Sequence, residues 1–135
     1  QCEELAARAR EIADRHVRPS AAKYDKAQEY NWEAARAVAD AGLFRVFVPK
    51  EYGGAGAGLL SLARVTEELA KADSGFGVAY AVNALGSFPI ILGGTEEQKQ
   101  RWLPDIAAGR RMVAFCLSEK SAGSNASGLA VTAVE

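Results

Sequence analysis

Apolar and charged positions alternate with the period of an α-helix through much of the chain. Apolar side chains recur every three or four positions over residues 3–17, and Pro19 ends the pattern, which predicts an amphipathic helix. A short helical piece is expected over residues 21–26. Over residues 59–72, apolar and charged side chains again separate onto opposite faces, as on a surface helix.

Another helix has recognisable signals at both of its ends. Asn31 is a good N-cap for a helix over residues 32–41, and Gly42 suits the left-handed position that follows a helix. Residues 51–58 are then expected to form a glycine-rich loop. Its spacing matches neither the P-loop nor the dinucleotide fingerprint, so we interpret it as a sharp connection rather than a phosphate cradle.

Residues 74–86 carry no charge and contain several glycines and alanines. A helix that is apolar on every side is normally buried, so we expect neighbours all round it. Its small side chains leave space for another backbone or for a ligand. No apolar run approaches the roughly 18 to 20 residues that span a bilayer, so no membrane span is expected.

The next helix is expected to begin at a capping box. The side chains of Thr95 and Gln98 are placed to satisfy free backbone N–H groups at its first turn. Pro104 is expected to restart a further short turn, which Gly109 ends.

The character of the sequence changes near residue 110. Residues 112–117 and 131–134 have the composition of β-strands, and the stretch between them is rich in Ser, Gly, Ala and Asn. We therefore expect an all-α domain over residues 1–110 and the start of a β-domain over residues 111–135. Since the chain begins with Gln and ends within a strand-like stretch, both ends are expected to be cuts within a longer protein.

Composition and charge narrow the function classes. The chain has 16 Lys and Arg against 17 Asp and Glu, a net charge of −1, and the two signs are interspersed. This surface is not typical of nucleic-acid binding or of binding to anionic membranes. The first 20 residues are charged, unlike a signal peptide, so a cytoplasmic location is expected.

The chain does not predict metal or thiol chemistry. Its two cysteines, Cys2 and Cys116, are far apart and lack a CxxC partner, and its one histidine is His16. A zinc site or a Cys/His catalytic pair needs more ligands than these. We expect His16 to be structural or solvent-facing and Cys116 to be a small buried residue in a strand.

Four segments of the chain, taken in order, are similar to motifs of a known protein family. Residues 42–54 contain Gly-Leu-Phe and Val-Pro-Lys-Glu-Tyr-Gly-Gly, residues 67–73 read Glu-Glu-Leu-Ala-Lys-Ala-Asp, residues 94–104 contain Gly-Thr-Glu-Glu-Gln-Lys and Trp-Leu-Pro, and residues 114–124 contain Ala-Phe-Cys-Leu-Ser-Glu and Ala-Gly-Ser. In this order they resemble the acyl-CoA dehydrogenase family. The resemblance covers nearly the whole chain and implies that family's N-terminal helical domain, followed by the first strands of a β-barrel domain.

In that family, a stretch of the form Thr/Ser-Glu-Pro-x-Ala-Gly-Ser-Asp lies against the flavin. The resemblance therefore implies that FAD contacts Phe115, Leu117, Ser118, Gly123 and Ser124, and that Ser124 also lies beside the acyl-CoA. A hydroxyl can fix the orientation of a polar ring edge, and small residues let backbone amides approach it.

Three positions in this stretch depart from the family pattern. Lys120 stands where Pro is usual, Ser121 where Gly is common and Asn125 where Asp is usual. Asn keeps the short side chain that caps a turn, so that change is mild. Lys120 frees a backbone angle and adds a charge, which bears on the rigidity of the loop and on the type of substrate.

The resemblance implies α,β-desaturation of an acyl-CoA thioester, in which a carboxylate removes the α-proton and a hydride passes to the flavin. The family places that carboxylate beyond the end of this chain, so no catalytic residue is expected here and the chain alone is not expected to be active. Glu119 is not assigned the role, and the other candidates are interpreted as solvated or capping residues: Glu67, Glu68, Glu96 and Glu97.

The uncharged helix is expected to form a wall of the acyl-chain pocket, because family members place this helix beside the fatty acyl tail. The lining candidates are Val78, Ala81, Val82 and Leu85. The alternative is a core helix that packs only against other helices.

The resemblance also implies partners and leaves alternatives. The expected partners are an acyl-CoA substrate, an electron-transfer flavoprotein as electron acceptor, and further copies of the full-length protein in a homotetramer or homodimer. An acyl-CoA oxidase or a flavin monooxygenase of the same superfamily would use the same helical domain. A helical binding module without a redox role is the alternative from another class.

Overall fold

The computed structural model describes residues 1–132 and 134, and the described residues form helices and no strand. This confirms the expected all-α helical domain. The α-helices are α1 Cys2–Ile12, α2 Ala21–Ala27, α3 Trp32–Asp40, α4 Gly58–Ala70, α5 Ser74–Gly93 and α6 Glu96–Ala107. A π-helical turn, Ala13–Val17, continues α1, and short 3-10 turns lie at Arg18–Ser20, Leu43–Arg45, Lys50–Tyr52 and Ala126–Gly128.

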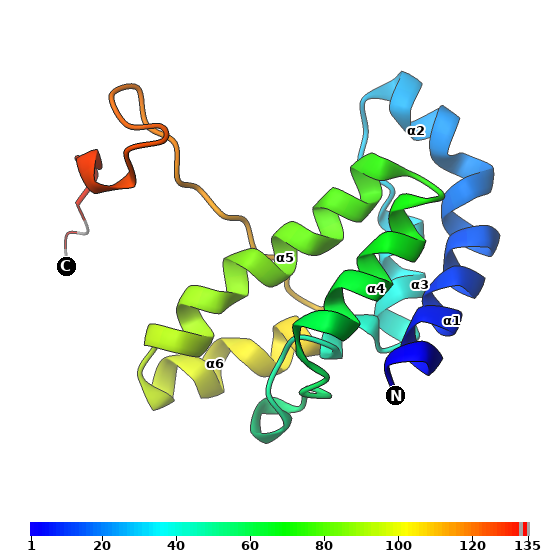
Figure 1. The fold of residues 1–135 in the computed structure, drawn as a ribbon, viewed down its shortest axis with the longest axis horizontal. Helices are drawn as coiled ribbons and strands as arrows, with labels where there is room; N and C mark the ends of the chain where they lie inside the picture. The colour runs from blue at the N-terminus through cyan, green and yellow to red at the C-terminus, as the bar shows by residue number, and fades with distance from the viewer. Residues whose placement is uncertain (133, 135) are drawn as a thin grey trace.

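The helix α4 packs against α1 on one side and against α5 on the other, and α6 lies beneath one end of α5 (Figure 1). The connection between α3 and α4 supplies much of the core, since Leu43, Phe44 and Val48 are almost completely buried. The Tyr80 hydroxyl on α5 donates a hydrogen bond to the Leu43 carbonyl at 2.8 Å. Beyond α6 the chain crosses α5 and ends away from the bundle (Figure 1).

The helix ends that the sequence marks are formed as expected. Asn31 Oδ1 accepts the backbone N–H of Ala34 at 2.9 Å, and Gly42 has a φ of 71° in the left-handed region. Thr95 and Gln98 form the capping box, since each side chain accepts the other residue's backbone N–H. These are local interactions, which is why short sequence motifs predict them.

Two prolines lie inside helices. Pro104 does not restart a turn as expected but lies within the unbroken α6, whose Leu103 and Ile106 are fully buried. The helix α5 runs past Gly86 to Gly93 with Pro89 in its interior. A proline removes one backbone hydrogen bond, and burial of neighbouring apolar side chains offsets that loss.

The expectation that α5 is covered on every side is wrong for this chain. Tyr80 and Ala84 are buried, but Val78 is 61% and Leu92 is 83% exposed. Within the described residues, α4 and α6 cover one side of the helix and leave the other bare. An uncharged sequence reports how apolar a helix is, but not which neighbours the chain itself provides.

The length of α5 also differs from expectation. By length and composition alone it could cross a membrane, although the sequence was expected to hold no such run. This is weak evidence, because the core helix of a globular protein passes the same test. Asn83 and Ser87 on α5 are fully buried against the rest of the chain, as polar residues of a core helix are.

The strand-like stretches form no β-ladder among the described residues, so the expectation of a strand over residues 112–117 is wrong here. Among the described residues after α6, the one β-bridge is the isolated bridge between Glu119 and Ala122. A strand is held by hydrogen bonds to a neighbouring strand, and no described segment supplies one. Cys116, expected to be buried in a strand, is exposed, and residue 133 of the second stretch lies outside the described residues.

Glu68 is a buried carboxylate that joins α4 to α1 by pairing with two partly exposed cations, and it is not the solvated residue that the sequence predicts. Its side chain is 2% exposed and accepts two hydrogen bonds from the Arg10 guanidinium, at 3.0 and 3.1 Å. Lys71 Nζ lies 2.9 Å from the same carboxylate. The hydrogen bonds from Arg10, followed by that from Lys71, lower the pKa of Glu68 to about 2.

We expect Glu68→Ala to lower the free energy of unfolding by about 1–2 kcal/mol, since the hydrogen bonds that Arg10 and Lys71 donate to the carboxylate are lost. The loss is limited because both cations reach solvent and regain hydration. Glu67→Ala is the matched control, since Glu67 is the next residue and its side chain is 47% exposed. Urea denaturation of both variants measures the difference. Equal losses in the two variants would show that the buried position of Glu68 adds nothing beyond the contribution of an exposed ion pair.

The pairing of Glu68 with Arg10 and Lys71 predicts a pH dependence. The pKa of Glu68 is about 2 in the folded protein and near its ordinary value of 4.5 when the chain is unfolded. Its contribution is therefore complete above about pH 4.5 and is lost as the pH falls towards 2. The difference in unfolding free energy between wild type and Glu68→Gln should shrink over this interval; a difference that stays constant would contradict the assignment.

Candidate functional site

One face of α5 carries the four residues expected to line an acyl pocket. Val78, Ala81, Val82 and Leu85 recur at intervals of three, one and three residues, so they lie along one side of the helix. Val78 is 61% and Leu85 is 43% exposed, and the other two are half-buried. The structure therefore brings all four onto the bare side of α5.

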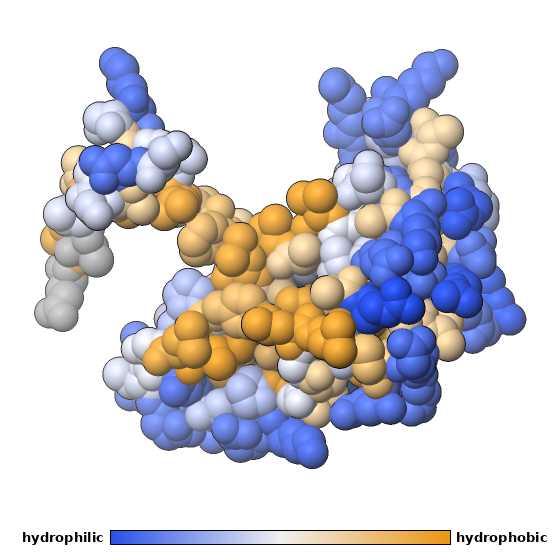
Figure 2. All heavy atoms as spheres, in the orientation of Figure 1, coloured by the Kyte–Doolittle hydropathy of each residue, from blue (hydrophilic) through white to orange (hydrophobic). Residues whose placement is uncertain are grey.

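The surface around this face is apolar. Figure 2, drawn in the orientation of Figure 1, shows hydrophobic residues gathered over α5 and the adjacent part of α4, with hydrophilic residues towards α1 and α2. Exposed Leu59 and Leu60 at the start of α4 add to the apolar surface. Contiguous apolar surface of this kind is typical of a ligand-binding or interaction face.

The segment that follows α6 crosses α5 at close range. Asn83 Oδ1 accepts the backbone N–H of Val113 at 2.6 Å. At Gly86 an added Cβ would lie 2.9 Å from the carbonyl oxygen of Ala114. This crossing brings the start of the segment expected to face the flavin against the same helix that carries the acyl-lining candidates.

The residues expected to contact the flavin lie beyond this crossing and are accessible. Phe115 is 39% and Leu117 is 40% exposed, and Ser118, Gly123 and Ser124 are exposed as well. Phe115 and Leu117 are two positions apart in the same segment, and both expose part of their apolar side chains. The segment therefore presents an apolar pair with hydroxyl groups further along the chain.

A carboxylate closes the loop that carries Ser118 to Ser124. Glu119 Oε2 accepts the backbone N–H of Ala130 at 2.8 Å, and its Oε1 accepts that of Val131 at 3.0 Å. Both oxygens are thus engaged in holding the two ends of the loop together. Glu119 therefore has a structural role in this loop.

This donor set fits one flank of the FAD that the resemblance implies. A flavin ring has an apolar face and a polar edge, and here two accessible apolar side chains precede exposed hydroxyls and glycines. Ser118 and Ser124 could donate hydrogen bonds to the edge, and Gly123 would allow backbone amides to approach it. The same five residues would hold the cofactor from one side only.

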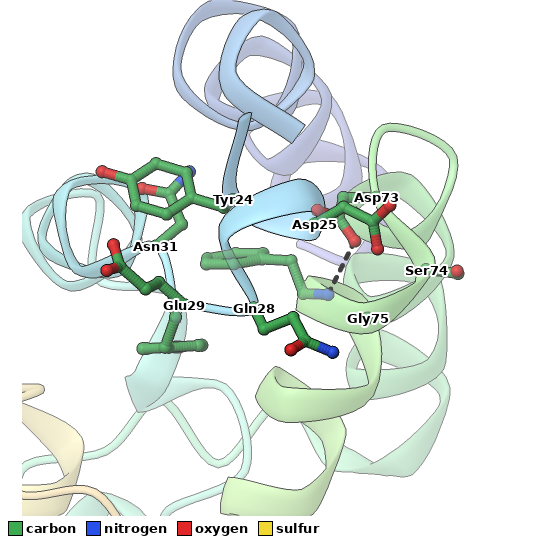
Figure 3. Close-up of a pocket in the computed structure, with 10 residues that line it drawn as sticks. Tyr24, Asp25, Gln28, Glu29, Asn31, Asp73, Ser74 and Gly75 are labelled. Atoms are coloured by element: carbon green, nitrogen blue, oxygen red, sulfur yellow. Dashed lines mark hydrogen bonds between the residues drawn. The ribbon is translucent and has the colours of Figure 1, made fainter. Parts of the chain in front are cut away.

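A separate hollow of about 540 Å³ lies between the end of α2 and the start of α5 (Figure 3). Its lining includes the carboxylates of Asp25, Glu29 and Asp73 and no Lys, Arg or His. The Asp73 carboxylate caps α5 by accepting the Phe76 backbone N–H at 3.0 Å (Figure 3). Acidic walls repel the phosphates of CoA and of FAD, so this hollow suits neither.

Sequence reasoning missed two residues that organise the site. Asn83 is a polar residue in an otherwise apolar helix, and that position was itself a signal that the amide has a partner. Glu119 lies within the motif that carries the resemblance, but its hydrogen bonds reach residues eleven and twelve positions away. No local pattern predicts a contact of that span.

Comparison with known proteins identifies the family. Residues 1–110 match the family described as acyl-CoA dehydrogenase, N-terminal domain. The chain is 39% identical over 126 residues to the probable acyl-CoA dehydrogenase fadE25 of Mycobacterium leprae, covering 93% of this chain and 32% of that protein. It is 38% identical over 128 residues to the 3-(aryl)acrylate reductase of Clostridium sporogenes, covering 94% of this chain and 34% of that one.

A solved structure shares the same arrangement. The acyl-CoA dehydrogenase of Bacillus anthracis, solved in complex with FAD, superimposes with a TM-score of 0.81 at 31% identity, over 95% of this chain and 22% of that one. The chain spans about a third of the length of the curated relatives it matches. On these findings the chain belongs to the acyl-CoA dehydrogenase family and carries that family's N-terminal helical domain.

Proposed function

We propose that this chain is the helical part of a cytoplasmic FAD-dependent acyl-CoA dehydrogenase that desaturates an acyl-CoA thioester between its α- and β-carbons. The catalytic base is assigned to a part of the protein beyond this chain. An electron-transfer flavoprotein is the proposed electron acceptor, and the full-length protein is proposed to assemble as a homotetramer or homodimer.

The observation that carries the proposal is the bare apolar face of α5 beside the crossing segment. Val78 and Leu85 expose apolar surface that the described residues do not cover. Gly86, the residue after Leu85, lies against Ala114, the residue before Phe115. An acyl chain on this face and a flavin ring against residues 115–118 would therefore lie close together, as hydride transfer requires.

The chain's own residues would supply binding and orientation. FAD, when bound, supplies the electron acceptor for the hydride that leaves the β-carbon. The apolar face of α5 would hold the acyl tail and exclude water from it, with a contribution of roughly 0.8 kcal/mol per buried methylene. Ser118 would orient the ring edge, and Ser124 would donate to the cofactor or the substrate.

One relative favours a second candidate reaction. The 3-(aryl)acrylate reductase is 38% identical to this chain, and its name describes the reduction of a double bond. The same scaffold could serve a protein that works in this direction, and the bare face of α5 would then receive an aryl group. The assay must therefore include an aryl acrylate as an oxidant of the reduced flavin.

The test uses the full-length protein carrying this chain, loaded with FAD. Acyl-CoA substrates are supplied with either an electron-transfer flavoprotein or molecular oxygen as acceptor, and formation of the enoyl-CoA is measured. In a parallel assay, an aryl acrylate is supplied to the reduced protein, and reoxidation of the flavin is measured. Enoyl-CoA formation that depends on the electron-transfer flavoprotein supports the proposal. Oxygen consumption as fast as the transfer to the electron-transfer flavoprotein would identify an oxidase. The absence of a flavin absorbance spectrum would favour a binding module.

We expect Ser118→Ala to shift the reduction potential of the flavin and Ser124→Ala to weaken cofactor or substrate binding. Each variant loses one hydrogen bond, about 0.5–1.5 kcal/mol for a neutral acceptor and about twice that for a charged one. Ser127→Ala, an exposed serine of the same loop, is the control. Wild-type FAD affinity, potential and kcat/KM in both variants would show that the two serines are misassigned.

A further inference from the structure

The helix α5 holds the crossing segment through a side chain to which the proposed function gives no role. Asn83 is fully buried, and its Oδ1 accepts the Val113 N–H across thirty positions of sequence. This hydrogen bond joins the helical bundle to the chain that leads to Phe115. We propose that Asn83 is a positioning residue that sets residues 115–118 against the acyl-facing helix.

Gly86 supports the same crossing by a different means. It lies one turn beyond Asn83, and an added Cβ would lie 2.8 Å from Val113 Cγ1 and 2.9 Å from the Ala114 carbonyl oxygen. Only a residue without a side chain lets the segment pass this close to the helix. Asn83 therefore holds the segment, and Gly86 provides the space for it.

The side-chain NH2 group of Asn83 shows that packing alone does not account for an asparagine at this position. Its Nδ2 is buried and has no hydrogen-bond partner among the described residues. An apolar side chain would avoid an unpaired buried donor, because such groups are destabilising. The specific contribution of Asn83 is therefore the acceptor that it offers to Val113.

The crossing lies between the two parts of the proposed site. Leu85 of the acyl face precedes Gly86, and Phe115 of the flavin-facing segment follows Ala114. A small shift of the crossing would change the distance between acyl chain and flavin, on which the reaction depends steeply. The inference rests on the proposed function, because it takes residues 115–118 to face a flavin.

The test compares variants of the full-length FAD-loaded protein. Asn83→Ala removes the acceptor, and Asn83→Asp keeps one. Gly86→Ala displaces the segment while Asn83 stays. The matched control is Ser87→Ala. Ser87 is also fully buried on α5, and its substitution removes a 2.7 Å hydrogen bond to the Asn83 backbone carbonyl but leaves the Asn83 side-chain acceptor in place.

We expect Asn83→Ala and Gly86→Ala to raise the dissociation constant of FAD roughly three- to tenfold, comparable to the loss of one net hydrogen bond. Both should also shift the flavin's reduction potential. Asn83→Asp should keep the wild-type FAD affinity and reduction potential. Ser87→Ala should lower Tm without changing the affinity or the potential. If Ser87→Ala changes FAD affinity as much as Asn83→Ala does, or if neither changes it, the inference is wrong.

Amide hydrogen exchange at Val113 separates this inference from the proposed function. Faster exchange of the Val113 amide in Asn83→Ala than in Ser87→Ala supports the positioning role of Asn83. Equal exchange rates contradict that role, whether or not flavin is bound. Failure of the wild-type protein to bind FAD would refute the proposed function and the flavin-facing role of residues 115–118. Amide exchange would still test the hydrogen bond between Asn83 and Val113. If Asn83→Ala does not fold, Gly86→Ala replaces it as the variant expected to lose FAD affinity, and Asn83→Asp remains the variant expected to keep it.

Discussion

Ala81→Phe in the full-length protein is expected to shorten the range of acyl chains that the enzyme accepts. Ala81 is a half-buried residue on the bare face of α5, between the exposed Val78 and Leu85. A phenyl ring at this position would fill space along the proposed acyl path and barely touch the thioester. The value of kcat/KM should fall by roughly fourfold for each methylene that is excluded.

The dependence on chain length is what distinguishes a pocket wall from a core position. A series of straight-chain acyl-CoA substrates measures it, with Ala7→Phe as the control because Ala7 is exposed on α1, away from α5. Short substrates should keep near wild-type kcat/KM in Ala81→Phe, and long ones should lose it progressively. A uniform loss at every length, or no loss at all, would indicate that α5 only packs against other helices.

Gly54→Ala is expected to destabilise the fold strongly. An added Cβ would lie 1.8 Å from the carbonyl oxygen of Val48 and 2.3 Å from its carbonyl carbon. Both atoms belong to the backbone of the core-forming connection, so no rotamer change relieves the clash. We expect a loss of at least about 2–3 kcal/mol in the free energy of unfolding and a fall in Tm of roughly 5–10 °C.

Gly93→Ala provides the matched control, because an added Cβ there meets nothing within 4 Å. Thermal unfolding of both variants should show a large fall in Tm for Gly54→Ala and almost none for Gly93→Ala. Similar Tm values for wild type and Gly54→Ala would show that the chain does not turn at Gly54 as described.

The parts of the fold that the sequence predicts are those governed by neighbouring residues. Asn31 and Thr95 cap their helices, and Gly42 follows α3 in the left-handed region, because each interaction spans three residues or fewer. Alternation of apolar and charged side chains placed α1 and α4 to within a few residues. These features need no knowledge of the rest of the chain.

The features that the sequence did not predict depend on distant residues. The exposure of Val78 follows from which helices the chain sets beside α5, and the lack of a strand at residues 112–117 follows from the lack of a described partner strand. Glu68 was predicted to be solvated because its burial follows from the packing of α4 against α1, where its partner Arg10 lies 58 positions away. Neither the periodic spacing of apolar residues nor a short sequence motif predicts contacts between residues this far apart.

The sequence indicated which candidate residues lie together, and their roles in binding cofactor and substrate stay a prediction. The resemblance placed the five flavin-facing candidates on one segment, and the helical period placed the four acyl-lining candidates on one face of α5. Neither source predicted how the segment and the helix are joined. That junction depends on Asn83 and Gly86, whose partners lie about thirty residues further along the chain.

The most direct test of the account is anaerobic titration of the full-length, FAD-loaded protein with acyl-CoA substrates of increasing chain length. We expect the visible absorbance of the flavin to bleach with at least one of these substrates and an equivalent amount of enoyl-CoA to form. A full-length protein that binds no flavin, or a bound flavin that no acyl-CoA bleaches, would contradict the account.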